Sequence, residues 1–359
     1  MSEMDTRDDF CLAPLRGVTV RAFRNLHALW FAAPDRAVAP FIPTFAGAKV
    51  KPVLLKDIDP DLGQAVPVIP QVIGKDVAQL RTLLRAFKEL GYACADLNAG
   101  CPYPFIIKKS RGAGLMRDAE AFARMLEAGC EEMPGGFSVK VRLGVDTPDL
   151  LIQRMGLINA FPLREVAVHA RTARQMYEGK VLLDAFAAAL AVCRHPVVYN
   201  GDLRTRQDWL RLKARFPGIT RWMIGRGLAV DPFLIERLAG GEAPARDVAR
   251  LKGFLDDYVA ANAEELYGPV SVLGRMKELW GYLHLSLRQG ERVWRSVRIC
   301  RTLEEYHRVV EGVFREFPGF VADEALCGIE EMRTSSSELR TTNAEGNFDV
   351  QSSTLGVER

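Results

Sequence analysis

Short apolar segments recur along the chain as far as Gly225, and amphipathic stretches separate them. The segment Tyr92–Asn98 alternates, so that Ala93, Ala95 and Leu97 share one face while polar side chains share the other. This period of two predicts a strand whose second face is polar. Comparable segments predict strands over Phe10–Ala13, Ala37–Ile42, Val66–Ile73, Tyr92–Asn98, Phe137–Leu143, Glu165–His169, Pro196–Asn200 and Arg221–Gly225.

Helical stretches lie between most of these strands, among them Val77–Leu90, Asp118–Cys130 and Thr205–Phe216. Eight strands that alternate with helices predict an α/β fold of the (β/α)8 TIM-barrel class. The competing class is a doubly wound sheet, whose phosphate fingerprint follows its first strand. The chain has Ala13-Pro14-Leu15-Arg16-Gly17 at that place, so the barrel is favoured.

Beyond residue 240 the pattern becomes helical, with predicted helices over Asp247–Glu265, Val270–Arg288 and Glu291–Gly312. Their apolar positions recur at helical spacing, which predicts a small core. In the last stretch Ser, Thr, Asn, Gly and Glu dominate and the apolar period is lost. The predicted organisation is a barrel domain over 1–240, a small helical domain over 241–320 and a disordered tail over 334–359.

Composition and cysteine usage narrow the class of protein. With 359 residues and 48% apolar content, the chain can bury a large core. Its seven cysteines are scattered without CxxC pairs, which is typical of reduced thiols in the cytoplasm and predicts no zinc site. The apolar runs are too short to span a bilayer and the first residues are polar, so neither a membrane segment nor a secretion signal is expected.

The stretch Asp96–Pro102 carries the strongest candidate chemistry. Gly100 permits a sharp turn after the predicted strand, and Pro102 favours an extended backbone at Cys101. That geometry projects a thiol from the end of a strand into the space above it. A buried structural cysteine is the alternative interpretation. The adjoining Asn, Gly and Pro, and the basic run Lys108–Gly112, favour the functional one.

Polar residues also stand where other predicted strands end, which is where barrels of this class carry their chemistry. Loops with Gly201 and Gly225, and with Arg226 beside them, are suited to cradle a phosphate. Lys140 would face a ring that becomes anionic on reduction, and Gln71 would hydrogen-bond the edge of that ring. A flavin satisfies both requirements.

Several motifs follow one another in a fixed order: Ala13-Pro14-Leu15-Arg16-Gly17-Val18-Thr19, then Asp96–Pro102, Val139-Lys140-Val141-Arg142-Leu143-Gly144, Val168-His169-Ala170-Arg171-Thr172, Asn200-Gly201-Asp202 and Met223-Ile224-Gly225-Arg226-Gly227. This ordered set resembles the motifs of the FMN-dependent tRNA-dihydrouridine synthases. The similarity covers residues 10–240 and continues more weakly to about residue 315.

The resemblance implies an enzyme that uses NADPH or NADH to reduce FMN and passes hydride to C6 of a uridine in tRNA, giving 5,6-dihydrouridine. Cys101 falls on the position of the catalytic acid, which delivers a proton to C5. It must therefore remain a thiol, with a pKa not far below its ordinary value. The implied cofactor-binding residues are Pro14, Leu15, Arg16, Gln71, Lys140, His169, Asn200, Gly201, Asp202, Gly225 and Arg226.

Two basic segments are candidates for contacts with tRNA phosphates. Lys108, Lys109 and Arg111 would lower the pKa of Cys101 if they pointed at it, so they are expected to point outward. An ordinary solvated face is the alternative for each segment. The second segment is a stripe at helical spacing, formed by Arg288, Arg292, Arg295, Arg298 and Arg301, of which the central Arg292, Arg295 and Arg298 are assigned to tRNA.

Two other functions remain open from the sequence. One is an FMN barrel oxidoreductase that acts on a small molecule such as a pyrimidine or an enone, and the basic helical domain argues against it. The other is a non-catalytic RNA-binding protein, and the presence of both Cys101 and Lys140 argues against that. No stable protein partner is predicted.

Overall fold

The structure, a computed structural model, describes residues 7–47, 50–239, 245–316 and 319–327. Parallel strands in this part of the chain form one sheet in the order β3-β5-β6-β7-β8-β9-β10-β1-β2-β4. Their bounds are β1 Asp9–Leu12, β2 Arg36–Val38, β3 Ile42–Pro43, β4 Val68–Ile69, β5 Gln71–Ile73, β6 Ala95–Ala99, β7 Phe137–Gly144, β8 Val166–Thr172, β9 Val197–Asn200 and β10 Arg221–Ile224.

The sheet closes on itself into a barrel. Only Pro70 separates β4 from β5, and a short segment with Pro40 separates β2 from β3, so each pair is one interrupted strand. The strand order begins with β3 and β5 and ends with β2 and β4. Because β2 continues into β3 and β4 continues into β5, the first and last strands of this order are joined, and the sheet is closed. Ten strands with two pairs merged give eight, which confirms the predicted (β/α)8 class. The interruptions were not predicted. They occur at proline because proline has no backbone N–H to donate to the neighbouring strand.

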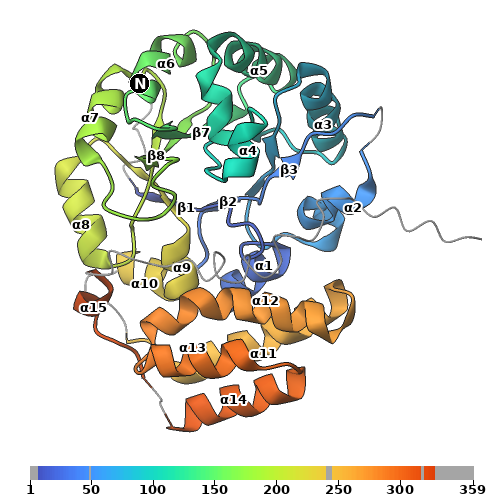
Figure 1. Cartoon of the computed structure of the whole chain (residues 1–359), viewed down its shortest axis with the longest axis vertical. Helices are drawn as coiled ribbons and strands as arrows, with labels where there is room; N and C mark the ends of the chain where they lie inside the picture. The colour runs from blue at the N-terminus through green and yellow to red at the C-terminus, as the bar shows by residue number, and fades with distance from the viewer. Residues whose placement is uncertain (1–6, 48–49, 240–244, 317–318, 328–359) are drawn as a thin grey trace, which may run out of the picture.

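Helices cover the outside of the barrel (Figure 1). Strand residues that face them, such as Leu97, Val139 and Val141, are fully buried. No helix in the described ranges combines the length and apolar character needed to cross a membrane. The helices of the barrel and its loops are α1 Arg21–Trp30, α2 Pro52–Leu55, α3 Val77–Glu89, α4 Pro104–Lys108, α5 Ala119–Glu132, α6 Leu150–Ile158, α7 Leu183–Val192, α8 Arg206–Arg215, α9 Arg226–Val230 and α10 Leu234–Ala239.

A helical bundle follows the barrel and lies below it in Figure 1. It packs on α1 closely enough that a Cβ at Gly253 would overlap the ring of Trp30, whose Nε1 donates to Asp257 at 2.8 Å. The predicted boundary at 240/241 and the predicted tail 334–359 lie outside the described residues. The bundle helices are α11 Val248–Glu265, α12 Gly268–Leu283, α13 Gly290–Ile299 and α14 Leu303–Glu316, followed by α15 Asp323–Cys327.

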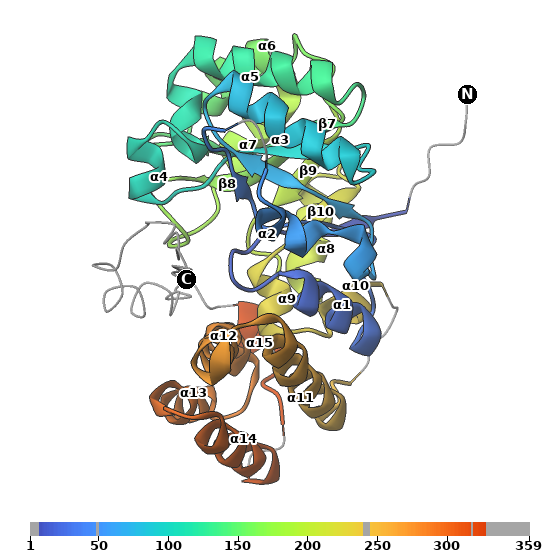
Figure 2. The same ribbon diagram turned by 90° about the vertical axis from the view of Figure 1, so that its right-hand side faces the viewer.

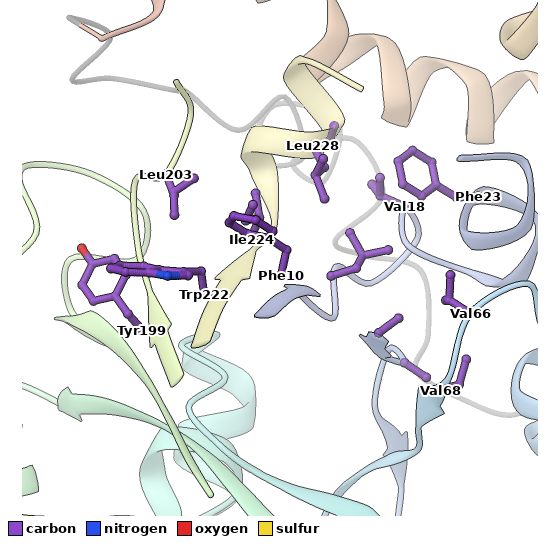
Figure 3. Packing of buried hydrophobic residues seen from close by; sticks show 14 of the residues in the cluster. Phe10, Val18, Phe23, Val66, Val68, Tyr199, Leu203, Trp222, Ile224 and Leu228 are labelled. Atoms are coloured by element: carbon purple, nitrogen blue, oxygen red, sulfur yellow. The ribbon is translucent and has the colours of Figure 1, made fainter. Parts of the chain in front are cut away.

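Large apolar side chains fill the space between the strands and the helices (Figure 3). The rings of Tyr199 and Trp222, on neighbouring strands, meet edge to face with centroids 5.8 Å apart. Phe10 lies on the next strand, β1, and is also buried. Since residues alternate along a strand, these apolar positions leave the polar ones to face the barrel interior and its mouth.

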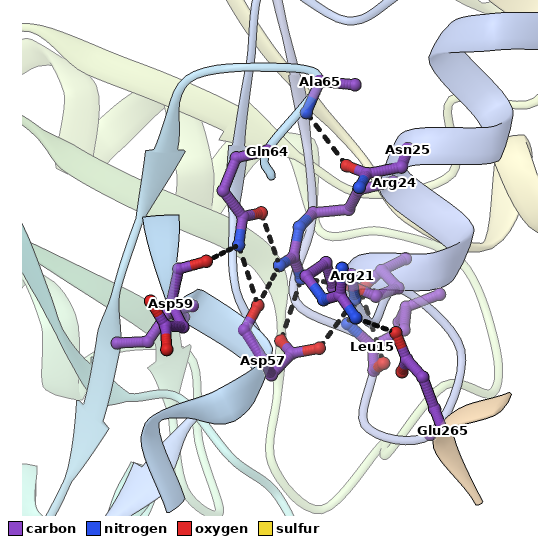
Figure 4. A network of polar contacts seen from close by, with 12 residues as sticks. Leu15, Arg21, Arg24, Asn25, Asp57, Asp59, Gln64, Ala65 and Glu265 are labelled. Carbon is purple, nitrogen blue, oxygen red and sulfur yellow. Dashed lines mark hydrogen bonds and ion pairs between the residues drawn. The ribbon is translucent and has the colours of Figure 1, made fainter. Parts of the chain in front are cut away.

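Arg24, on α1, is fully buried and holds the start of the barrel in place (Figure 4). Its Nη1 donates to the carbonyl of Thr19 and to Asp57, both at 2.9 Å, and its Nη2 donates to Gln64 at 3.0 Å. Charged hydrogen bonds of this kind offset the cost of burying a guanidinium. They fix the loop between β1 and α1, which reaches the barrel mouth.

The predicted single helix Glu291–Gly312 is wrong, because the structure has two helices, α13 and α14. The Thr302 hydroxyl accepts from the N–H of Glu305 at 3.2 Å, and the Glu305 carboxylate accepts from the N–H of Arg301 at 2.6 Å. These bonds begin a new helix at Leu303. Arg301 therefore lies between the helices, and Arg288 lies after α12, so the predicted stripe on one helix reduces to its three central arginines.

Candidate active site

A cavity opens at the carboxyl ends of the barrel strands and gathers nearly all of the predicted site. Cys101 lines it together with the predicted cofactor residues Pro14, Leu15, Arg16, Lys140, His169, Asn200, Gly201, Asp202, Gly225 and Arg226. Gln71 is the predicted cofactor residue absent from this lining; it is fully buried beneath the mouth.

The Cys101 thiol is held by a short turn after β6. The Asn98 side-chain oxygen accepts from the backbone N–H of Gly100 at 3.1 Å and from that of Cys101 at 2.8 Å. Gln71 orients Asn98, because its oxygen accepts from the Asn98 amide at 2.8 Å while its own amide donates to Asp96 at 2.7 Å. The contact of Gln71 with a flavin ring stays a prediction; in the structure Gln71 positions the cysteine turn.

Burial raises the pKa of the Cys101 thiol above its ordinary value, although a backbone hydrogen bond from Tyr103 and the charges of Arg142, Arg16 and Lys140 oppose the change. The side chain is only 6% exposed, so water stabilises a thiolate poorly. Lys108 and Lys109 are exposed, as expected, and are not among the cations that act on the thiol. Cys101 is therefore a protonated group at neutral pH.

Alkylation of Cys101 by iodoacetamide is expected to accelerate with pH throughout the neutral range, with a midpoint above pH 9.0. The reason is that only the thiolate reacts and burial raises the pKa of this thiol. Peptide mapping by mass spectrometry at each pH gives the rate at Cys101, with the urea-unfolded chain as the reference. A plateau already reached below pH 8 would mean that the folded protein stabilises a thiolate, contrary to this interpretation.

Lys140 rises from β7 into the centre of the mouth. Its Nζ donates to the side-chain oxygen of Asn200 at 3.0 Å, and the Asn200 amide donates to the carbonyl of Met223 at 2.8 Å. Burial, with a contribution from Arg142, lowers the pKa of Lys140 to about 8. Lys140 therefore lies directly beside the predicted cofactor loops, as a cation that can also lose its proton.

Three guanidinium groups converge on Asp202, which follows β9. Arg171 binds it with two bonds of 3.0 and 2.5 Å, Arg204 with one of 3.1 Å and Arg226 with one of 3.2 Å. Burial opposes ionisation of Asp202, but the bond from Arg171 and the three positive charges outweigh it and lower the pKa of this carboxyl. Three positive charges against one negative leave an excess of two, which suits a phosphate dianion.

His169, also predicted at the cofactor site, is a neutral imidazole. Burial comes first among the causes that lower its pKa well below the ordinary range, followed by the charges of Arg142 and Lys140. Its Nε2 lies 3.5 Å from Nη1 of Arg171, which can only donate, so this ring nitrogen is the acceptor.

Sequence reasoning missed other residues of the mouth. Tyr177, in the loop after β8, has its ring 5.2 Å from the Arg142 guanidinium and 4.9 Å from that of Arg226. Arg142 also donates to the carbonyl of Met176 at 2.6 Å, which holds this loop over the cavity. The cavity lining further contains Tyr103, Arg204, Glu278 and Tyr282.

Glu278 and Tyr282 belong to α12, so the helical bundle contributes directly to the mouth. Helix α12 packs closely on Gly17, where a Cβ would overlap the Glu278 carboxylate. Gly17 also has a positive φ of 82°, which a side chain would disfavour. Arg275 of the same helix donates to the Gly17 carbonyl. Neither α12 residue stands near a motif, and only the folded chain brings them to the site.

The fold and this charged mouth define an enzyme of the (β/α)8-barrel class, with its chemistry at the carboxyl ends of the strands. The family model described as Dihydrouridine synthase (Dus) matches residues 11–311. The chain belongs to this family, which confirms the predicted relationship.

Relatives of known name agree with this assignment. A probable tRNA-dihydrouridine synthase of Rhodobacter capsulatus is 28% identical over 64% of this chain and 70% of its own length. A tRNA-dihydrouridine(16) synthase of Shewanella oneidensis is 25% identical over 84% of this chain and 96% of its own.

Among solved structures, an old yellow enzyme homologue from Zymomonas mobilis aligns with a TM-score of 0.46 and 11% identity, over 64% of this chain and 87% of that one.

Proposed function

We propose that this chain binds FMN and uses NADPH or NADH to reduce uridines of tRNA to 5,6-dihydrouridine. The observation that carries the proposal is the pairing, in one cavity, of a protonated Cys101 with a buried, positively charged cluster around Asp202. Membership of the dihydrouridine synthase family supports one reaction in which both the thiol and the charged cluster take part.

The residues present fit the cofactor. The arginine cluster around Asp202 offers its excess charge to the FMN phosphate, with the backbone at Gly201 and Gly225 beside it. A Cβ at Gly225 would crowd the side chain of Ala13, so glycine lets this loop pack closely against the segment that follows β1. Lys140 would lie against the ring and balance the charge that a reduced flavin gains.

FMN would supply the hydride that adds to C6 of the uracil ring. Addition there leaves enolate character at the neighbouring carbonyl, and C5 then requires a proton. Cys101 can donate it because burial keeps the thiol protonated at neutral pH. The cluster of Asn98 and Arg142 around the Cys101 turn orients that thiol toward the cavity.

The two elements that carry the proposed tRNA contacts, α4 and α13, lie on one side of the molecule. Figure 2 shows α4, beside the barrel, and α13, in the bundle, both on the left. Lys108 and Lys109 are exposed at the end of α4, and Arg292, Arg295 and Arg298 are exposed on α13. A tRNA over the mouth would meet both surfaces, which favours RNA as the substrate over a small molecule.

Purified protein is expected to be yellow and to release FMN on denaturation. Replacing Arg226 by Ala should weaken FMN retention by about 1.5–3 kcal/mol, or roughly 10- to 150-fold, through loss of a charge-assisted phosphate contact. Fluorescence titration of the apoprotein with FMN measures the change. A Leu210→Ala variant on the outer helix α8 is the control. Protein that stays colourless and cannot be reconstituted with FMN would refute the proposed cofactor.

The substrate is tested by adding acceptors to the reduced protein. Bulk tRNA that lacks dihydrouridine should reoxidise the flavin and gain dihydrouridine, whereas free uridine and simple enones should do so far more slowly. Faster reoxidation by the small molecules would favour another FMN oxidoreductase. Failure of NADPH and NADH to reduce the flavin would favour a non-catalytic RNA-binding protein.

A further inference from the structure

Helix α4 carries an apolar surface that the proposed reaction leaves unexplained. Phe105 is 46% exposed on this helix, among exposed lysines, and the Lys109 ammonium lies 4.1 Å from the centre of its ring. Single exposed apolar residues are common on proteins. This one lies four residues after Cys101 on α4, which Figure 2 shows beside the barrel, so RNA seated over the mouth would lie close to it.

The segment that carries Phe105 is fixed to the Cys101 turn. The N–H of Ala113 donates to the Cys101 carbonyl at 3.1 Å, and the N–H of Arg111 donates to the Ile106 carbonyl at 3.1 Å. Gly112 has a φ of 55°, and a Cβ there would press on Cys101. Phe105 is thus presented at a set position relative to the thiol.

Arg111 adjoins the same turn and has an unusual environment. It is partly buried, yet within the described ranges of the chain its guanidinium makes no hydrogen bond or ion pair. Its Nε is buried without a partner. By contrast, Arg142 donates to the backbone carbonyls of Gly100 and Thr172. Arg171 donates to the carbonyl of Gly179 and to the Asp202 carboxylate. A partly desolvated cation without a counter-charge is suited to an anion from a ligand.

We propose that Phe105 and Arg111 form a nucleotide subsite beside the catalytic mouth, for the tRNA nucleotide next to the uridine that enters it. The proposal rests on the proposed function. A uridine drawn out of folded RNA leaves its neighbour without a stacking partner. The Phe105 ring replaces that partner, and Arg111 binds the adjoining phosphate. Aromatic rings stack on any base, so this subsite holds the RNA without reading its sequence.

A base with a neighbouring phosphate also occurs in NADPH, so the experiment has one arm for each source. The first arm measures affinity for an unmodified tRNA transcript over a series of salt concentrations. Phe105→Ala should weaken binding roughly 5- to 150-fold, the range expected for one stacked base. Its salt dependence should match the parent, because stacking releases no counterions. Arg111→Gln should instead flatten the salt dependence by about one unit of slope.

The second arm measures flavin reduction against NADPH concentration. Half-saturation should be the same for the parent and for Phe105→Ala. A rise in that concentration together with unchanged tRNA affinity would assign the subsite to the reductant and overturn the proposal.

Two further variants separate stacking from packing. Phe105→Tyr keeps the aromatic face and should bind tRNA within about twofold of the parent, because a phenol stacks as well as a phenyl ring. Leu210→Ala removes a side chain of matched exposure, 47%, from α8 and should change nothing. Parental tRNA affinity in Phe105→Ala, or an equal loss in Phe105→Tyr, would overturn the subsite.

Failure of this inference is distinguishable from failure of the proposed function. If the parent protein forms dihydrouridine in the transcript while Phe105→Ala binds it equally well, only the subsite is wrong. If the parent forms none, the proposed function itself is refuted.

Discussion

Replacing Cys101 by alanine is expected to slow dihydrouridine formation by ~10²–10⁴-fold, the usual contribution of a positioned general acid. The variant should still bind FMN and be reduced by NADPH, because the arginine cluster around Asp202 and the side chain of Lys140 are unchanged. The loss should therefore appear only in the step with tRNA. Mixing pre-reduced protein with tRNA and counting dihydrouridine over time isolates that step.

Cys94 provides the matched control. It lies on the same segment of chain, is partly buried and contacts Arg164, with 2.9 Å between Sγ and Nη1, but it does not line the cavity. Cys94→Ala should react at the parental rate. Equal rates for Cys101→Ala and the parent would show that Cys101 is a structural cysteine, the alternative that its burial alone would favour.

The barrel could be predicted because each strand is encoded by the alternation of apolar and polar residues within its own segment of sequence. Alternation along β7 sets Val139 and Val141 against Lys140 and Arg142, and the polar face points to the mouth in the structure. Carboxyl ends of parallel strands meet at one end of a barrel, so residues after β6, β7, β9 and β10 can be grouped from the sequence alone. The grouping holds for all predicted cofactor residues except Gln71.

The partners of these residues were not predictable, since they depend on which side chains meet across the mouth. Asp202 was expected at the cofactor, and the structure adds that it holds Arg171, Arg204 and Arg226 together. Tyr282 reaches the cavity from another layer of the molecule. The break between α13 and α14, in contrast, could have been predicted. Thr302 and Glu305 have the spacing of a capping box, which the sequence alone contains.

Converting Arg292, Arg295 and Arg298 together to Gln is expected to weaken tRNA binding on the order of 10²-fold near physiological salt, and to flatten its salt dependence by about one unit of slope per lost contact. The three side chains are exposed on α13, while Val293, Trp294 and Val297 of the same helix are buried. The substitutions therefore leave the bundle core intact. FMN content and flavin reduction by NADPH should not change.

The stripe matters because the bundle is fixed to the barrel. α11 is held on α1 by the Trp30–Asp257 hydrogen bond and by Phe23 and Phe254, whose rings meet edge to face at 5.9 Å. Phosphates bound on α13 would then stand at a constant distance from Cys101, and that distance would select which uridine reaches the mouth. A control variant with Arg124, Arg194 and Arg211 changed to Gln loses the same charge from exposed positions around the barrel. If the two triple variants show the same salt slope, the stripe is an ordinary solvated face and another surface must hold the tRNA.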